Sequence, residues 1–353
     1  MSDAQEEKAV KAAFGAVNRN KLISEFLARP EYAGEPLWKT VYRLLLWVDA
    51  TTGLGHCYES DKSQPGKNWY PRALAFHDWL STQFCVDPNK VVDEIDHLFR
   101  TATEQLVKYV LSQKVKVLQK AAGQRAKFTG RNFPEPGDDP ELVSIVQEVL
   151  GANFATEPTA EQWKLLVERV RQYVTLENKR KNLVGEGFED VLAAVGRKAL
   201  GAAGYDVNPR KVLQTIPGFE NKDVGEKTNR VDLVITREQD HRRVLVTAKW
   251  SIRADREKQF PQEHQSYVRA NSVNRPWQFV LITNEFDPAR LMRACDGFQG
   301  NNYMFEKVVH INPEGVLAAY GEGAEATMAK VRRYFEEGRL VSMSDWLEGL
   351  AAA

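Results

Sequence analysis

The sequence has little of what marks several common protein classes. Its 353 residues include three cysteines, and Cys57, Cys85 and Cys295 show no Cys-x-x-Cys spacing. This excludes a disulfide framework and a structural zinc site of the usual kind, so we expect the cysteines to pack in the interior. The longest apolar runs, such as 44–48 and 279–282, are too short to cross a bilayer, and the N-terminus has no apolar signal-peptide core. We therefore expect a cytoplasmic protein without membrane contact.

An excess of charge of either sign is also lacking. The 48 basic and 48 acidic residues give a net charge of zero. A protein that holds nucleic acid mainly through an overall positive field would be basic, so nucleic-acid binding here would need a local basic cleft. Short basic clusters occur at residues 114–131 and 177–181, but such runs are more often solvated helix faces than binding surfaces.

Several widespread catalytic motifs are missing too. The six histidines are scattered, and the sequence contains neither a His-Glu-x-x-His nor a Gly-x-Ser-x-Gly pattern. The run Gly185-Glu-Gly lacks the third glycine of a dinucleotide loop, and no Walker lysine motif is present. These absences argue against a zinc protease, a serine hydrolase of the common type and ATP-driven activity.

Hydrophobic spacing divides the chain into a helical first part and a mixed second part. Apolar residues recur at helix-like spacing over residues 8–124, and the proline-rich segment 132–140 interrupts the pattern. We predict an N-terminal helical domain at 1–133, a linker at 134–140 and a catalytic domain at 141–353.

The second domain changes from a helical to a strand-like period along its length. A capping box of Thr159 and Gln162 begins one of its helices. The alternation of helices and strands predicts an α/β or α+β fold with a central mixed sheet flanked by helices. The predicted helices are 141–150, 160–177, 185–200, 261–269, 288–294 and 324–336, and the predicted strands are 230–236, 244–249, 278–283 and 307–312.

Two charged residues stand on neighbouring apolar strands. Asp232 lies in Val-Asp-Leu-Val-Ile-Thr, Lys249 ends Arg-Val-Leu-Val-Thr-Ala-Lys, and the short connection 237–242 should fold the strands into a hairpin. Thr247 shares a face with the lysine, while Ala248 points to the other face. Core strands rarely carry an unpaired charge. The pair is therefore either a structural ion pair or a metal-dependent nuclease site that holds a divalent cation beside an activated water.

A second acid is needed for the nuclease interpretation. In the Asp…Glu-x-Lys arrangement the position two before the lysine is acidic, and here it is Thr247. The best substitute is Glu263, which follows Pro261 in the first turn of a predicted helix and would point back toward the strand end. Asp232, Glu263 and a backbone carbonyl near Ala248 are predicted to hold Mg²⁺, with water and phosphate completing its shell. The lysine would orient or deprotonate the attacking water.

A third group of charged residues follows the lysine strand. Arg253, Asp255 and Arg256 lie on the segment that leads into the predicted helix at Pro261. The planar fork of arginine matches guanine O6 and N7, while an acid can accept from cytosine N4 or hold the two arginines in place. This segment is suited to reading G·C pairs beside the bond that is cut.

The run from Lys249 to Arg256, taken with Glu263, resembles the CCGG family of type II restriction endonucleases. The resemblance covers about residues 184–300 and implies a PD-(D/E)xK fold whose second acid is displaced from the lysine strand to the following helix. It implies that Asp232, Lys249 and Glu263 are catalytic, with Asp232 and Glu263 as metal ligands. One departure is Val231, which stands where the family name places a proline.

The resemblance also assigns roles outside these three residues. It implies that Arg253, Asp255 and Arg256 read the CCGG core in the major groove. The family has a further catalytic glutamate on a helix ahead of the sheet, and Glu189 matches it, with Glu186 as the alternative.

The function implied is Mg²⁺-dependent hydrolysis of double-stranded DNA at a palindrome with a CCGG core, leaving 5′ overhangs. A two-fold site is most simply read by a homodimer. A cognate DNA methyltransferase is the companion that this function implies. Two alternatives stay open: a related nuclease that reads CCNGG, and a DNA-binding protein on the same fold that does not cut.

Overall fold

The structure, a computed structural model, describes residues 3–48, 65–67, 70–87, 97–126, 130, 140–150, 158–220, 229–252, 257–273, 276–320 and 326–353. The chain forms two compact units, one comprising Met1–Ala13 and Thr103–Asn182 and the other Phe14–Ala102 and Leu183–Ala353. The grouping of Phe14–Ala102 with the C-terminal half differs from the predicted helical domain at 1–133. Almost all of the predicted linker lies outside the described residues, so the boundary there stays a prediction.

The first unit is helical. It contains α1 (Asp3–Ala13), most of α6 (His97–Arg125), α7 (Pro140–Leu150) and the first part of α8 (Ala160–Leu200). The predicted capping box is confirmed, because the Gln162 amide donates to Thr159 Oγ1 at 3.3 Å and the Thr159 amide donates to Gln162 Oε1 at 2.8 Å. A small apolar cluster contains Val146, Trp163 and Val167, with Leu150 and Leu166 packed against it.

Helix α8 is continuous over 41 residues, so the prediction of separate helices at 160–177 and 185–200 is wrong. Gly185 and Gly187 lie inside the helix without ending it. A Cβ added at Gly187 would lie 3.1 Å from Cγ1 of Val48, the last residue of α3 (Leu37–Val48). Gly187 therefore serves the close approach of a neighbouring helix rather than a helix end.

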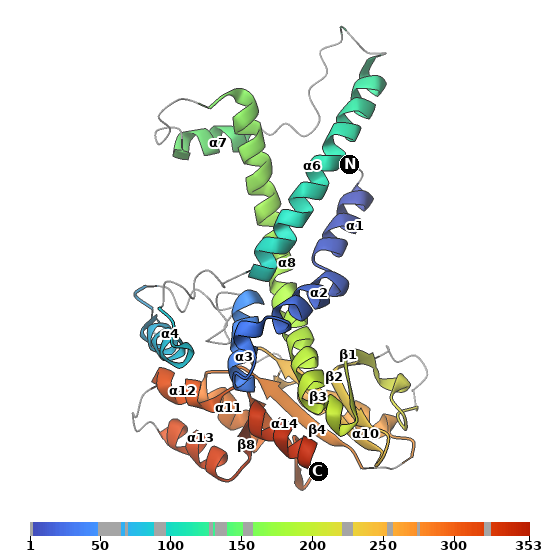
Figure 1. Ribbon diagram of the computed structural model, residues 1–353, viewed down its shortest axis with the longest axis vertical. Helices are drawn as coiled ribbons and strands as arrows, with labels where there is room; N and C mark the ends of the chain where they lie inside the picture. Colours follow the sequence, from blue (N-terminus) through green and yellow to red (C-terminus); the bar gives the residue numbers. More distant parts are fainter. Residues whose placement is uncertain are drawn as a thin grey trace. The chain divides into compact units, whose positions relative to one another are not determined.

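The second unit is built on a six-stranded sheet in the order β1-β2-β3-β4-β7-β8 (Figure 1). The first three strands pair antiparallel and the last four pair parallel, so the predicted α/β fold with a central mixed sheet is confirmed. The strands are β1 (Tyr205–Val212), β2 (Arg230–Arg237), β3 (Arg242–Lys249), β4 (Gln278–Thr283), β7 (Lys307–His310) and β8 (Leu340–Ser342). A separate two-stranded ribbon pairs β5 (Phe298–Gln299) with β6 (Asn302–Tyr303).

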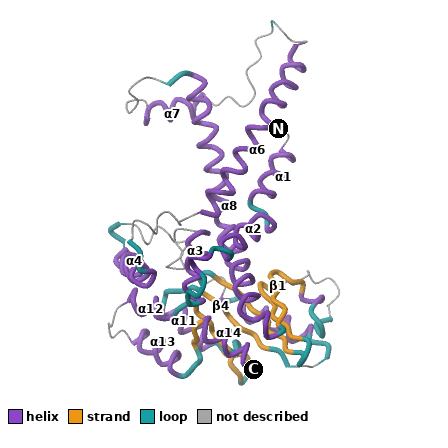
Figure 2. Tube along the Cα trace, viewed as in Figure 1, coloured by secondary structure: helices purple, strands orange, loops and turns teal. Residues whose placement is uncertain are grey.

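Helices surround the sheet (Figure 2). Helix α11 contacts β7 and α13, while α14 contacts β7, β8 and α3. The helices α12 and α14 were not predicted. The helices that follow the sheet strands are α10 (Phe260–Ala270), α11 (Pro288–Asp296), α12 (Pro313–Tyr320), α13 (Ala326–Glu336) and α14 (Met343–Ala352).

Helices from the N-terminal half complete the second unit: α2 (Ala16–Leu27), α3 and α4 (Tyr70–Phe84). Helix α4 packs against α12, and its Phe76 also meets Phe286, which precedes α11, with ring centroids 5.0 Å apart. A Cβ added at Gly315 of α12 would lie 3.2 Å from the rings of both Phe76 and Trp79. Glycine at this position lets the two helices approach closely, and the aromatic residues of α4 serve packing.

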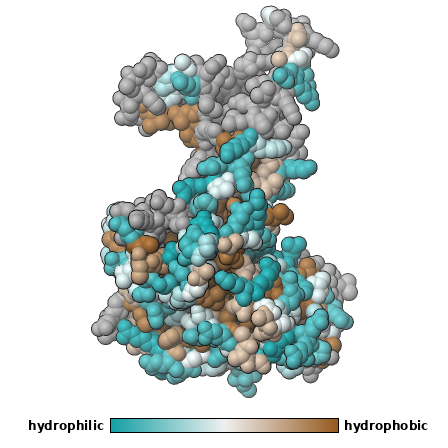
Figure 3. Space-filling view, viewed as in Figure 1, coloured by the Kyte–Doolittle hydropathy of each residue, from teal (hydrophilic) through white to brown (hydrophobic). Residues whose placement is uncertain are grey.

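Two remaining features of the fold are its surface and the positions of its cysteines. Polar and apolar residues are interspersed over the visible face (Figure 3). Among the described helices, none combines the length and hydrophobicity that a membrane crossing requires. Cys295 is buried, as predicted, but Cys85 is exposed, so the packing prediction is wrong there, and Cys57 lies outside the described residues.

Candidate active site

The Asp232–Lys249 pair lies on the hairpin of β2 and β3, whose antiparallel pairing confirms the predicted hairpin. Lys249 Nζ donates to Asp232 Oδ2 at 2.5 Å, and the amide of Ala248 donates to the same oxygen at 2.9 Å. Both charged side chains are partly accessible, 21% for Asp232 and 17% for Lys249. Within the described part of the chain no hydrogen bond reaches Oδ1 of Asp232, so one carboxylate oxygen is left for a further ligand.

Thr247 occupies the position where an acid stands in the Asp…Glu-x-Lys arrangement. Its Oγ1 donates to Asp232 Oδ2 at 3.3 Å, and its side chain is buried. Thr247 and Lys249 therefore face the same side, as predicted from the alternation of a strand. A hydroxyl can orient the carboxylate of Asp232 but supplies no second negative charge.

Glu263 lies in the first turn of α10, which begins one residue before Pro261. Burial lowers the pKa of Lys249, but the negative charges of Asp232, Glu263 and Glu189 outweigh burial, so this pKa is raised. For Tyr267, one turn further along α10, burial raises the pKa, and the charges of Glu263 and Asp232 raise it further. Two separate side chains thus lie in the combined field of Asp232 and Glu263.

Glu189 lies on α8 and is the fourth charged residue of this region. Burial raises its pKa to about 7, the charge of Asp232 adds to this rise, and Arg210 and Lys249 act against it. Glu186, the alternative, is 50% exposed and pairs with Arg19 at 2.8 Å. Glu189 therefore lies in the field of Asp232, whereas Glu186 is paired with Arg19.

Sequence reasoning missed three residues beside Glu189. Arg210 on β1 donates to Glu189 Oε2 at 2.9 Å and also pairs with Asp190, which Arg19 holds from its other side at 2.7 Å. The strand β1 went unpredicted because Pro209 interrupts its pattern, and without the strand Arg210 had no place near the site. Its left-handed backbone, with φ of 51°, is the structural signal that marks it.

The predicted readout residues Arg253, Asp255 and Arg256 lie outside the described residues. The described residues on either side of this segment, Ile252 and Glu257, each contact another part of the second unit. The amide of Ile252 donates to Glu285 Oε2 at 2.7 Å, and Glu257 pairs with Arg293 at 2.9 Å.

The donor set fits a hard divalent cation. Within the described residues no three His, Cys, Asp or Glu side chains form a metal cage. Mg²⁺ does not require one, since it is usually held by one or two carboxylates and completed by water and substrate phosphate. The charge of Asp232 helps raise the pKa of Glu189 to about 7, and a cation between such carboxylates relieves their repulsion. One or two of the carboxylates Asp232, Glu263 and Glu189 would supply the protein's oxygen ligands.

The described residues of the second unit line three pockets, and one of them borders Glu263. A polar groove of about 510 Å³ runs beside Glu263 and is lined by Arg230, Gln262, Gln265 and Arg269, among others. Its side chains offer amide and guanidinium donors, as a nucleic-acid backbone requires.

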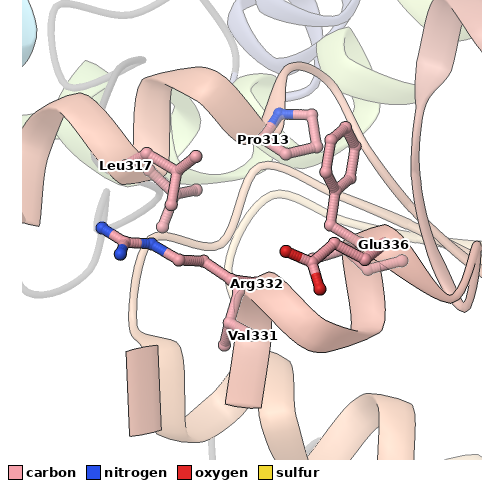
Figure 4. A pocket seen from close by; sticks show the side chains of 8 residues that line it. Pro313, Leu317, Val331, Arg332 and Glu336 are labelled. Carbon is pink, nitrogen blue, oxygen red and sulfur yellow. The ribbon is translucent and has the colours of Figure 1, made fainter. Parts of the chain in front are cut away.

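Another pocket, of about 180 Å³, lies between α12 and α13 (Figure 4). It is mostly apolar, with Pro313, Leu317 and Val331 on its wall and Arg332 and Glu336 at its side. It contains none of the site residues named above, so we do not assign it to the active site.

Comparison with known proteins adds little. No protein-family model matches the chain, and no curated protein matches it. Among solved structures, the chain is similar to the restriction endonuclease PspGI in complex with substrate DNA. The match covers 59% of this chain and 70% of that chain, with a TM-score of 0.34 and 12% sequence identity. A likeness of this strength carries no argument, so the case for a function rests on the geometry of the site.

Proposed function

We propose that the protein is a type II restriction endonuclease of the PD-(D/E)xK kind. It hydrolyses DNA phosphodiester bonds with Mg²⁺ at a palindrome with a CCGG core and leaves 5′ overhangs. The single observation that carries this proposal is the meeting of Asp232 and Lys249 on one hairpin in the field of Glu263 and Glu189. An ion pair with a purely structural role would not need the two further carboxylates, Glu263 and Glu189.

Asp232 and Glu263 would hold Mg²⁺, which when bound would polarise the scissile phosphate and stabilise the leaving oxygen. Lys249 is a charged donor in the structure, and its raised pKa favours orienting the attacking water over accepting its proton. Thr247 and the Ala248 amide fix the Asp232 carboxylate.

Sequence reading is assigned to Arg253, Asp255 and Arg256, which in the chain directly follow the anchored residue Ile252. A homodimer would present two such segments to the two halves of a palindrome. A cognate methyltransferase would protect the same sites in the cytoplasm of the host.

The experiment is to digest one long DNA with the purified protein and Mg²⁺ and to sequence the fragment ends. We expect discrete fragments whose 5′ overhangs surround CCGG. Ends at CCNGG would move the protein to the related specificity. Specific binding without cutting would identify the non-cleaving DNA-binding alternative, and random nicking would contradict sequence-specific cleavage.

The displaced acid can be tested separately. We expect Glu263→Ala to raise the Mg²⁺ concentration needed for cleavage or to stop turnover, because a cation ligand is lost. Val268→Ala is the matched control, since Val268 is exposed on the same helix, has no carboxylate and does not line the polar groove. Equal Mg²⁺ requirements for the two variants would remove Glu263 from the metal site.

A further inference from the structure

We propose that Arg210 is the positioning residue that holds Glu189 in the active site and is itself held by a buried clamp of Asp190 and Arg19. This inference rests on the proposed nuclease function and deepens it. No motif in the sequence marks any of these three residues, and the contacts described below carry the assignment.

The backbone of β1 is distorted at Arg210. Pro209 pairs with Leu233 and Lys211 pairs with Val231, so Arg210 stands at the level of Asp232 on the neighbouring strand without a ladder pairing of its own. Its φ of 51° is a left-handed conformation that a residue with a side chain rarely adopts. Such conformations persist where the surroundings impose them, and they concentrate at functional sites.

The guanidinium of Arg210 is shared between two adjacent residues of α8. Nη1 donates to Glu189 Oε2 at 2.9 Å and to the carbonyl of Glu186 at 3.2 Å, while Nη2 donates to Asp190 Oδ1. The planar fork therefore fixes the direction of the Glu189 side chain relative to the helix. The Glu189 side chain stays 15% accessible, so the contact does not seal it off.

Asp190 is the fixed point of the clamp. It is fully buried, and its second oxygen accepts from Arg19 Nε at 2.7 Å. Arg19 comes from α2, is 3% exposed, and donates through Nη1 to the Phe14 carbonyl at 2.5 Å. A buried carboxylate that binds a cation through each oxygen has one stable orientation. Asp190 therefore fixes the guanidinium of Arg210, which in turn fixes the side chain of Glu189.

The test uses Arg210→Gly, because glycine adopts a positive φ without strain, so the variant removes the Arg210 side chain without straining the backbone. The matched control is His241→Gly at the turn between β2 and β3, where φ is 54° and the side chain is exposed. The measurements are single-turnover cleavage in Mg²⁺, DNA binding in Ca²⁺ and the thermal unfolding midpoint.

For Arg210→Gly we expect a folded protein that binds cognate DNA but needs more Ca²⁺ to do so, and that cleaves about 100-fold more slowly, the size of loss expected for a misplaced catalytic group. His241→Gly should match the wild type in all three measurements. Cleavage by Arg210→Gly at the wild-type rate would overturn the inference.

A second variant decides the matter if Arg210→Gly does not fold. Arg210→Lys keeps the charge but cannot bridge two carboxylates with a planar fork, so we expect slower cleavage with an unchanged melting temperature. A wild-type rate in this variant would overturn the positioning role. Failure of the proposed function is distinguishable, because the wild-type protein itself would then leave all DNA uncut.

Discussion

Glu189 and Glu285 are two carboxylates of the same unit whose pKa burial raises to about 7. Glu285 is fully buried and accepts from the backbone amides of Ile252 and Asp287 at 2.7 and 2.8 Å. Glu189 is partly accessible, is held by the side chain of Arg210, and lies in the field of Asp232. The two glutamates thus have similar pKa values in different surroundings. Glu285 is buried and holds backbone amides, whereas Glu189 is partly accessible and lies among other charged side chains, so only Glu189 is placed to take part in a reaction.

The surroundings of Glu285 confirm its structural character. The ring of His310 is buried, its Nε2 lies 3.0 Å from the Glu285 carbonyl, and burial lowers its pKa to about 4. Arg290 approaches Glu285 only to 3.6 Å. A strongly shifted pKa alone therefore does not distinguish a structural carboxylate such as Glu285 from the candidate site residue Glu189.

The largest difference between the charged cluster around Glu189 and the buried surroundings of Glu285 is expected in the rate of DNA cleavage. Asp232→Ala should lower the cleavage rate by about 10³-fold or more while leaving specific DNA binding in Ca²⁺, because a ligand of the catalytic cation is lost. Asp240→Ala, at the exposed turn of the same hairpin, is the control and should cleave normally. Comparable cleavage by both variants would contradict the site.

The next effect is on stability. Asp190→Asn should lower the free energy of unfolding by about 3–5 kcal/mol, because the partners of a buried ion pair are left without a full countercharge. Glu186→Gln removes another carboxylate that pairs with Arg19, but Glu186 is 50% exposed, so its effect should stay below about 1 kcal/mol. Urea unfolding of both variants measures the difference, and equal losses would show that Asp190 is no clamp.

Glu285 should make stability depend on pH. A carboxyl whose pKa rises from 4.5 to about 7 on folding binds a proton as the chain folds between these values, so stability falls as the pH rises through this window. The change from this group is about 3 kcal/mol. His310, with its pKa lowered from 6.5 to about 4, acts in the opposite sense and loses stability as the pH falls through that range.

The measurement is denaturant unfolding of the wild type and of Glu285→Gln between pH 5 and pH 8. The stability of the variant relative to the wild type should increase as the pH rises, because the variant has no carboxyl to ionise. A constant difference across the range would show that Glu285 is already ionised throughout and that the contrast with Glu189 is mistaken.

The smallest expected effect is that of Thr247→Val. It removes a 3.3 Å hydrogen bond to Asp232 while preserving shape, so we expect a loss of stability of about 1 kcal/mol and a modest decrease in cleavage. Ser in place of Thr247 keeps the hydroxyl and should restore cleavage. If the valine variant cleaves as the wild type does, the hydroxyl has no part in orienting Asp232.

Local patterns predicted the half of the site that lies on short, regular segments. The β2–β3 hairpin follows from two apolar runs and a polar turn, and the first-turn position of Glu263 follows from Pro261. Glu189 was assigned by resemblance, with Glu186 as the alternative, and the helix predicted to carry it is continuous through Gly185 and Gly187. For the hairpin and for Glu263, neighbours along the chain determine the geometry.

The other half could not be predicted, because residues distant in sequence determine it. Arg19 and Asp190 are 171 positions apart, and their contact depends on how α2 packs in the second unit. Arg210 lies beside a proline on a strand without regular alternation, and nothing in the local sequence marks its positive φ. The edge strand β8 is three residues long and offers no periodic signal.

The most direct test of the central claim is plasmid cleavage in Mg²⁺ by the wild-type protein beside Asp232→Asn and Lys249→Met, purified identically. We predict that the wild type converts supercoiled plasmid into discrete linear fragments, and that both variants leave it supercoiled. Cleavage of equal extent by all three proteins, or by none of them, would contradict the claim that Asp232 and Lys249 form a nuclease site.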